Sequence, residues 1–378
     1  MIDFDKLLKV VVEQGASDLF ITAGMPPSIK VNGRMTPMSK TALTPDQARE
    51  LVHTTMNESQ IQEFEMEHEC NFAIHSPTAG RFRVSAFYQR NFAGMVLRRI
   101  ETHIPSVDEL QLPEAIKQLA MTKRGLIIFV GATGTGKSTS LAAMIGYRNE
   151  KSKGHIITIE DPIEYVHEHR GCMVTQREVG VDTPSFEVAL KNTLRQAPDV
   201  IMIGEIRSRE TMDYAVAFAE TGHLCLATLH ANNANQALDR IINFFPADRH
   251  DQVWMDLSLN LRGMVAQQLV ATEDGSGRRA AIEILINTPL VSDMIRKGEV
   301  HALKEIMTKS REVGMQTFDQ ALFELYNDGV ISYDAALASA DSANDLRLLI
   351  KLSGGKQTGG GQRAVPAATT QGLSLEDD

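Results

Sequence analysis

Residues 131–138 read Gly-Ala-Thr-Gly-Thr-Gly-Lys-Ser, and this stretch decides the fold of most of the chain. It matches the pattern GxxxxGK[ST] and directly follows the apolar run LIIFV at 126–130. A strand, a glycine-rich loop and a helix in this order form a phosphate-binding loop, in which backbone N–H groups and the helix N-terminus face the phosphates. The predicted nucleotide contacts are Gly131, Ala132, Thr133, Gly134, Thr135, Gly136, Lys137, Ser138 and Thr139.

Three side chains of this stretch have separate predicted roles. Lys137 supplies a positive charge to the β and γ phosphates, and Ser138 offers an oxygen ligand to Mg²⁺. Thr139 is expected against the α phosphate. The stretch alone therefore predicts binding of a magnesium nucleotide.

The sequence around the loop predicts an α/β protein. Short apolar runs, LIIFV, HIITIE, VIMIG and HLCLATL, alternate with helical stretches from residue 125 onward, which is typical of a mostly parallel sheet covered on both faces. Residues 1–100 show alternating strands and amphipathic helices, which indicate a small α+β domain. We expect a linker at 101–113, an ATPase core at 114–288, a helical subdomain at 289–352 and a disordered tail at 353–378.

Composition limits the class of protein. The chain has 378 residues, which exceeds what one hydrophobic core usually organises. Counting 48 acidic against 38 basic residues gives a net charge of −10, which disfavours nucleic acid as a partner. No apolar run approaches the roughly 20 residues of a membrane span, and the first residues lack a basic signal region. We therefore expect a cytoplasmic protein of two or more domains.

Hydrolysis also needs a carboxylate near the γ phosphate, and in a parallel sheet such groups lie at the carboxyl ends of strands. Glu205 follows the strand at 200–203, and Glu160 ends the strand at 155–159, with Glu164 shortly after it. Asp199 begins the strand at 200–203, and about five residues at ~3.3 Å each put it roughly 17 Å from the end that carries Glu205. We therefore interpret Asp199 as a structural turn residue.

Two histidines flank the run LCLATL at 224–229. His230 follows the carboxyl end of this strand, where it can contact a phosphate or the catalytic water. His223 begins the strand, and its spacing alone favours a structural role.

Four stretches in this order, GATGTGKST, ITIEDPIEY, GEIRSRET and GHLCLATLHAN, resemble the Walker A, Asp box, Walker B and His box of the secretion-superfamily ATPases. These ATPases are the hexameric motors of type II secretion and type IV pili. The resemblance covers about residues 1–350. It implies a PAS-like α+β domain at the N-terminus, a RecA-like P-loop ATPase domain and a C-terminal helical subdomain. ASDLFITAG, GRFRVSAFYQR and GMQTFDQAL favour the pilus-retraction branch.

The resemblance implies a role for each matching residue. Glu205 corresponds to the catalytic Walker B glutamate, Glu160 and Glu164 to the Asp-box acids, and His223 and His230 to the His-box pair. The cofactors are ATP and Mg²⁺. In this family six subunits form a ring, and arginines from the N-terminal domain complete the site; the candidates here are Arg81, Arg83 and Arg195.

Departures from the family pattern favour one function over others. Extension-type pilus ATPases carry a four-cysteine zinc motif, which the three scattered cysteines cannot supply. The main retraction ATPase, PilT, carries the helix motif AIRNLI, whereas residues 290–295 read LVSDMI, with Ser292 in place of the arginine. The chain is therefore expected to be an accessory retraction ATPase that supports PilT and acts on the inner-membrane pilus platform protein, at the cytoplasmic base of the pilus machine.

Two alternatives belong to other classes. One is a nucleotide-gated scaffold that supports the main motor and whose hydrolysis is dispensable. The other is a nucleic-acid translocase, which the net charge of −10 disfavours.

Overall fold

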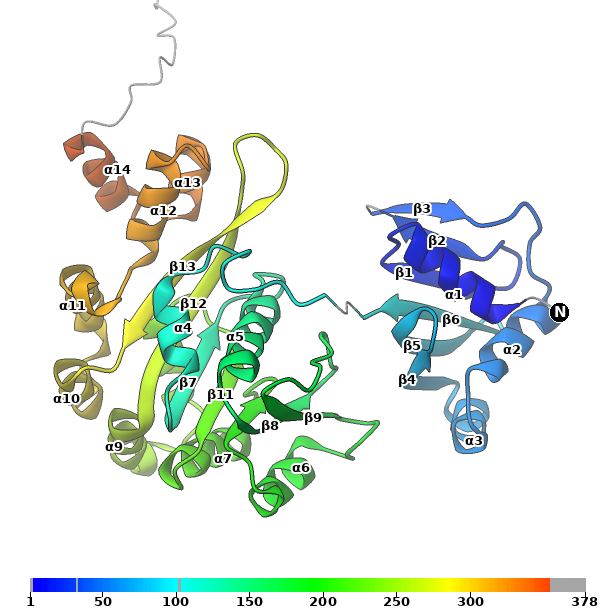
Figure 1. Ribbon diagram of the computed structural model, residues 1–378, viewed down its shortest axis with the longest axis horizontal. Coiled ribbons are helices and arrows are strands. Elements are labelled where there is room, and N and C mark those ends of the chain that lie inside the picture. Colours follow the sequence, from blue (N-terminus) through cyan, green and yellow to red (C-terminus); the bar gives the residue numbers. More distant parts are fainter. Residues whose placement is uncertain (1–2, 32, 101–102, 354–378) are drawn as a thin grey trace, which may run out of the picture.

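The computed structural model describes residues 3–31, 33–100 and 103–353. Two β-sheets organise these residues, one in the first hundred residues and one after residue 124 (Figure 1). The tail predicted at 353–378 lies outside the described residues except for Ser353. The predicted linker at 101–113 likewise lies outside them at residues 101–102.

The first sheet has six antiparallel strands in the order β3-β2-β1-β6-β5-β4. In the strand Gly80–Gln89, buried and more exposed side chains alternate from Phe82 to Ala86, as in a sheet with one face on a core. A capping box at Thr44 starts the second helix. The elements are α1 (Phe4–Glu13), β1 (Asp18–Thr22), β2 (Ser28–Val31), β3 (Arg34–Pro37), α2 (Pro45–Thr54), α3 (Glu58–Glu67), β4 (Glu69–Ser76), β5 (Gly80–Gln89) and β6 (Phe92–Arg99).

The second sheet has seven strands in the order β13-β12-β7-β11-β10-β8-β9. All neighbours pair in parallel except β12 and β13, which form an antiparallel hairpin. Its elements are α4 (Glu114–Ala120), β7 (Gly125–Val130), α5 (Lys137–Lys151), β8 (Gly154–Glu160), β9 (Cys172–Glu178), α6 (Phe186–Thr193), β10 (Val200–Ile203), α7 (Arg209–Glu220), β11 (Leu224–Leu229), α8 (Ala234–Ile242), α9 (His250–Asn260), β12 (Leu261–Ala271) and β13 (Arg278–Ile286).

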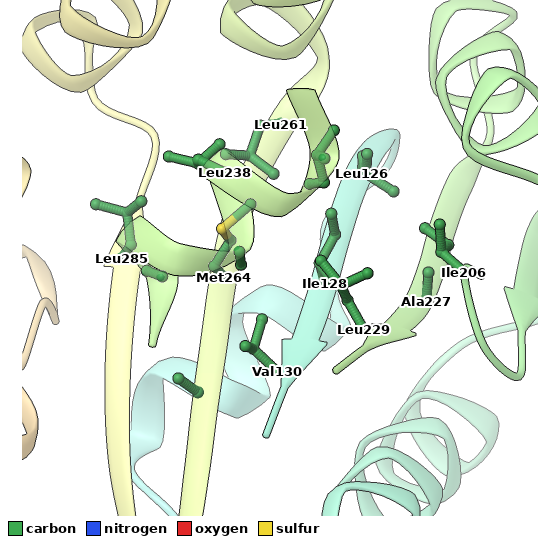
Figure 2. Packing of buried hydrophobic residues seen from close by; sticks show 14 of the residues in the cluster. Leu126, Ile128, Val130, Ile206, Ala227, Leu229, Leu238, Leu261, Met264 and Leu285 are labelled. Carbon is green, nitrogen blue, oxygen red and sulfur yellow. The ribbon is translucent and has the colours of Figure 1, made fainter. Parts of the chain in front are cut away.

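Helices cover both faces of this sheet, and strand β7 shows why. All six of its residues are buried, because successive side chains enter opposite cores. Ile127 and Phe129 pack in the cluster that contains α4 and α5. Leu126, Ile128 and Val130 pack in the other cluster, with α7, α8 and α9, as Figure 2 shows for part of that core. The continuous apolar runs in the sequence are therefore strands buried on two sides.

The last helices pack beyond the antiparallel edge of the sheet (Figure 1). They are α10 (Pro289–Lys297), α11 (Leu303–Lys309), α12 (Phe318–Asn327), α13 (Tyr333–Ser339) and α14 (Ala343–Leu352). Helix α12 contacts β13, and Ile284 forms an isolated antiparallel bridge with Gln316. Within the described ranges, no helix has the length and apolar character needed to cross a bilayer. The predicted mixed α/β architecture is confirmed.

Candidate active site

The phosphate-binding loop joins β7 to α5, and its glycines have backbone conformations that residues with side chains rarely adopt. Gly134 and Gly136 have φ angles of +79° and +85°. Gly131 has φ +158°, and a Cβ there would lie 2.5 Å from Thr135 Oγ1 and 2.7 Å from the Gln267 carbonyl oxygen. The loop therefore folds tightly against β12 and leaves Gly134, which has nothing within 4 Å of its Cβ position, open to a ligand.

Lys137 is the first residue of α5 and is 7% exposed. Its Nζ donates hydrogen bonds to the carbonyl oxygens of Gly131 at 2.7 Å and Ala132 at 2.8 Å. Burial lowers the pKa of Lys137, while the charges of Glu205 and Glu164 raise it. The ammonium group is therefore held at the loop, close to the acidic residues that the sequence assigns to the same site.

The predicted carboxylates meet because β8 and β10 are parallel neighbours. Ile159 pairs with Ile203, so the residues after each strand emerge at one edge of the sheet. Gly204 N–H donates to the Ile159 carbonyl oxygen at 2.7 Å, and a Cβ on Gly204 would lie 3.0 Å from that oxygen. This close approach places Glu205 beside Glu160. Both line a cavity of about 270 Å³ whose walls also include Lys137.

Glu160 is 8% exposed and is held by two side chains. Thr158 Oγ1 donates to Glu160 Oε1 at 2.6 Å, and Gln176 Nε2 donates to the same oxygen at 3.0 Å. Burial raises the pKa of Glu160 to about 7, although both hydrogen bonds act in the opposite direction. Glu160 therefore exchanges a proton near neutral pH.

Glu205 contacts two basic side chains at the mouth of the cavity. His230 Nε2 lies 3.1 Å from Glu205 Oε1, which brings the predicted histidine and glutamate together. Arg207 Nε donates to Glu205 Oε2 at 2.8 Å, and Arg207 Nη1 lies 3.6 Å from Asp161 Oδ2. Arg207 was not among the predicted site residues, although its i, i+2 spacing from Glu205 in an extended segment places both side chains on one side.

Two further residues of the site were also missed. Tyr165 lines the cavity, and its hydroxyl lies 2.8 Å from Thr139 Oγ1. Gln176 on β9 joins Glu160 to the loop after β8, because its Nε2 also donates to the Tyr165 carbonyl oxygen at 2.8 Å. No motif marks Gln176, since its role depends on the pairing of β9 with β8.

Other predicted residues lie away from the cavity. His223 precedes β11, seven residues and roughly 23 Å from His230 at ~3.3 Å per residue. Its Nδ1 contacts the Phe218 carbonyl oxygen at 3.3 Å and Thr221 Oγ1 at 3.1 Å. The structure therefore separates the His-box pair, and His223 has the structural contacts that its spacing favoured.

The three candidate arginines are also outside the cavity of this chain. Arg81 Nη2 donates to Glu178 Oε2 at 3.4 Å, which links β5 to β9, and the same oxygen accepts from Ile163 N–H at 3.2 Å. Arg83 is half-buried on β5, and Arg195 is exposed after α6. None of these arginines contacts Glu205 within the chain's described residues.

The residues of the cavity fit a magnesium nucleotide. The glycine cradle, the N-terminus of α5 and Lys137 provide donors for phosphate oxygens. Ser138 and the carboxylates of Glu160, Glu164 and Glu205 line the same cavity, and hard divalent cations prefer such oxygen ligands.

Comparisons with known proteins place the chain in a family. The family model described as type II/IV secretion system protein matches residues 1–321. The type IV pilus ATPase PilU of Pseudomonas aeruginosa is 72% identical over 374 residues, which cover 99% of this chain and 97% of that protein. The type IV pilus retraction ATPase PilT of the same species is 41% identical over 338 residues, which cover 89% and 98%.

A solved structure agrees with the sequence matches. The crystal structure of the pilus retraction motor PilT with bound ADP has a TM-score of 0.86 and 38% identity, and it covers 92% of this chain and 100% of that chain. The predicted resemblance to the retraction branch and the predicted P-loop ATPase are confirmed, and the chain is more similar to this PilU than to this PilT. The chain belongs to the family of type II/IV secretion system proteins.

Proposed function

We propose that this P-loop ATPase is a hexameric motor that couples ATP hydrolysis to type IV pilus retraction and twitching motility. It acts as an accessory partner of PilT, on the platform protein at the cytoplasmic side of the inner membrane. The identity of 72% to the pilus ATPase PilU, against 41% to the retraction ATPase PilT, supports a pilus ATPase other than PilT itself, and Ser292 in place of the arginine of the PilT helix motif supports the accessory role. The contact between Glu205 and His230 in the cavity of Lys137 is the observation that carries the catalytic part.

Glu205 is the residue that accepts a proton during hydrolysis. As a water oxygen bonds to the γ phosphorus, the bond from phosphorus to the bridging oxygen breaks, and its electrons remain on ADP. The proton that the water loses passes to the Glu205 carboxylate. His230 lies at 3.1 Å on one oxygen of this carboxylate and limits its rotation.

Phosphate binding is the role of the loop and of Lys137. The loop binds the phosphates through backbone N–H groups, and Lys137 exchanges its two carbonyl partners for phosphate oxygens. Ser138, Glu160 and Glu164 would hold Mg²⁺, which would supply positive charge to the phosphates when bound.

The cavity contains more acidic than basic side chains, although a bound triphosphate needs positive charge around it. Four carboxylates line the cavity, those of Glu160, Asp161, Glu164 and Glu205, and the lysine and arginine side chains in its lining are Lys137 and Arg207. A triphosphate adds more negative charge. Arginines of a neighbouring subunit in the ring would balance it, and Arg81, Arg83 and Arg195 are the candidates.

Motion between the two sheets would transmit the work of hydrolysis. The first sheet ends with β6 at Arg99, and α4 begins at Glu114. We therefore propose 101–113 as the hinge, with an N-terminal domain at 1–100, an ATPase core at 114–288 and a helical subdomain at 289–352.

The experiment compares the wild-type protein with Glu205→Gln and Lys137→Ala. Glu205→Gln should bind ATP with a Kd within about twofold of wild type and lose phosphate release, because only the proton acceptor changes. Lys137→Ala should lose ATP binding. Phosphate release by Glu205→Gln at the wild-type rate would contradict the catalytic assignment.

The cellular role is tested in a strain that lacks this protein but retains PilT. Wild-type protein should restore twitching and pilus retraction, and Glu205→Gln should not. Restoration by Glu205→Gln, together with capture by PilT in a pull-down, would instead show a nucleotide-gated scaffold. A rate of hydrolysis that rises with added DNA and falls steeply with salt would show a nucleic-acid translocase.

A further inference from the structure

Arg207 makes three contacts that converge on the acidic edge of the sheet. Its Nε and Nη2 both lie 2.8 Å from Glu205 Oε2, and its Nη1 lies 3.6 Å from Asp161 Oδ2. Asp161 directly follows β8, and Glu205 follows the neighbouring strand β10. One guanidinium group therefore bridges the ends of two strands and places two donors on a single carboxylate oxygen.

The backbone fixes where Arg207 points. Ile206, which is 1% exposed, is buried in the core between Glu205 and Arg207, and its N–H donates to the Thr228 carbonyl oxygen at 2.9 Å. Thr228 Oγ1 donates to the Gly204 carbonyl oxygen at 2.5 Å. With residues 204 and 206 tied to β11, the side chains on either side of Ile206 project together into the cavity.

Two neighbours thus occupy the two oxygens of Glu205. His230 contacts Oε1 and Arg207 contacts Oε2. Each carboxylate oxygen has about two lone-pair sites, so the two donors of Arg207 fill those of Oε2, and one site on Oε1, beside His230, remains for a water molecule. These contacts fix the plane of the carboxylate and thus the direction in which the remaining site on Oε1 faces.

Stability does not account for the contact. The Arg207 side chain is 60% exposed, and ion pairs at such exposure contribute little to folding. The contact has more effect on the orientation of the Glu205 carboxylate. A small misplacement of a reacting group can lower a rate by about 100-fold, so a carboxylate that must meet a water molecule needs a fixed orientation.

We propose that Arg207 is a positioning residue for Glu205 in ATP hydrolysis. It holds the carboxylate between the ends of β8 and β10 so that an unused lone pair meets the attacking water. This inference rests on the proposed function, because it takes Glu205 as the proton acceptor.

The test uses the full chain with Arg207→Gln and Arg207→Lys, and Arg209→Gln as the matched control. Arg209 lies two residues away and pairs with Asp213, so its substitution removes the same charge outside the cavity. Arg207→Gln should lower kcat about 10- to 100-fold and leave the Kd for ATP within about twofold of wild type. Arg207→Lys should have a rate between those of Arg207→Gln and wild type, because lysine keeps the positive charge but lacks the planar pair of donors. Arg209→Gln should match wild type.

A second background separates positioning from direct contact with phosphate. Glu205→Asp withdraws the carboxylate from the guanidinium by one methylene, so adding Arg207→Gln to it should cost less than threefold. An equal loss in both backgrounds would show that Arg207 acts independently of Glu205. A raised Kd with unchanged kcat would show nucleotide binding, and a kcat within twofold of wild type would also overturn the proposal. Hydrolysis by Glu205→Gln at the wild-type rate would instead overturn the proposed function itself.

Discussion

Glu283 provides a direct test of the electrostatics of the core. It lies on β13, is 2% exposed, and its Oε1 accepts the N–H of Ala234 at the start of α8 at 2.8 Å. Burial raises the pKa of Glu283 from 4.5 to about 7, with Asp341 acting in the same direction and Lys304 against it. Lys304 itself pairs with Asp341 at 3.0 Å and Asp319 at 3.6 Å. Glu283→Gln keeps the acceptor and removes the charge.

The sign and size of the effect follow from the raised pKa. The stability that the neutral Glu283 carboxyl provides is fully present below about pH 4.5 and is lost as the pH rises through about 7. Such a rise corresponds to about 3 kcal/mol at ~1.4 kcal/mol per pKa unit. Between pH 5 and pH 8, the wild-type protein should therefore lose about 2–3 kcal/mol more stability than Glu283→Gln.

Urea unfolding at pH 5 and pH 8 measures this difference. The exposed Glu273→Gln, on the loop between β12 and β13, is the control and should follow wild type at both pH values. Glu160, whose pKa burial also raises, is the same in every protein compared and so drops out of the difference. Equal losses of stability in wild type and Glu283→Gln would refute the reasoning, because Glu283 would then ionise in the folded state without cost.

Two further substitutions test the loop and the helix that follows it. Gly131→Ala should weaken ATP binding at least tenfold in a fluorescent-nucleotide titration, because its Cβ would meet Thr135 Oγ1 at 2.5 Å. The control is Gly277→Ala, whose Cβ would have nothing within 4 Å and which should bind ATP as wild type does. Normal binding by Gly131→Ala would show that the cradle tolerates a side chain. Arg148→Met should lower the free energy of unfolding by about 1–3 kcal/mol, measured by urea unfolding, because Arg148 Nη1 donates to two backbone carbonyl oxygens at the end of α4. A change below about 0.5 kcal/mol would mean that water replaces the guanidinium there.

Local sequence patterns were sufficient for the phosphate loop and for the carboxylates. A glycine-rich pattern after a buried strand specifies both the turn and the helix N-terminus, so the position of Lys137 follows from a few neighbouring residues. Glu205 and Glu160 could be placed at one edge because parallel strands share a direction, whatever their order in the sheet. Asp199 lies at the opposite end of these strands, where its Oδ2 accepts the His155 N–H at 2.8 Å, in agreement with its interpretation as a structural turn residue.

Contacts between distant segments could not be predicted in this way. Gln176 reaches Glu160 only because β9 pairs with β8 in a particular register, and Arg81 reaches Glu178 across 97 residues of sequence. The resemblance groups the two histidines in one box, and the structure places them at opposite ends of β11. Strand direction separated His223 from His230 where the resemblance paired them.

One carboxylate oxygen of Glu178 is shared between the two sheets. Oε2 accepts from Ile163, in the loop that follows Glu160, and from Arg81, in the N-terminal sheet. The Arg81 contact, at 3.4 Å, is already at the long end for an N–H···O bond, so a small displacement of the loop would break or tighten it. A displacement of one sheet against the other would therefore act on Glu178 Oε2, which lies at the end of β9 beside the acidic edge of the second sheet.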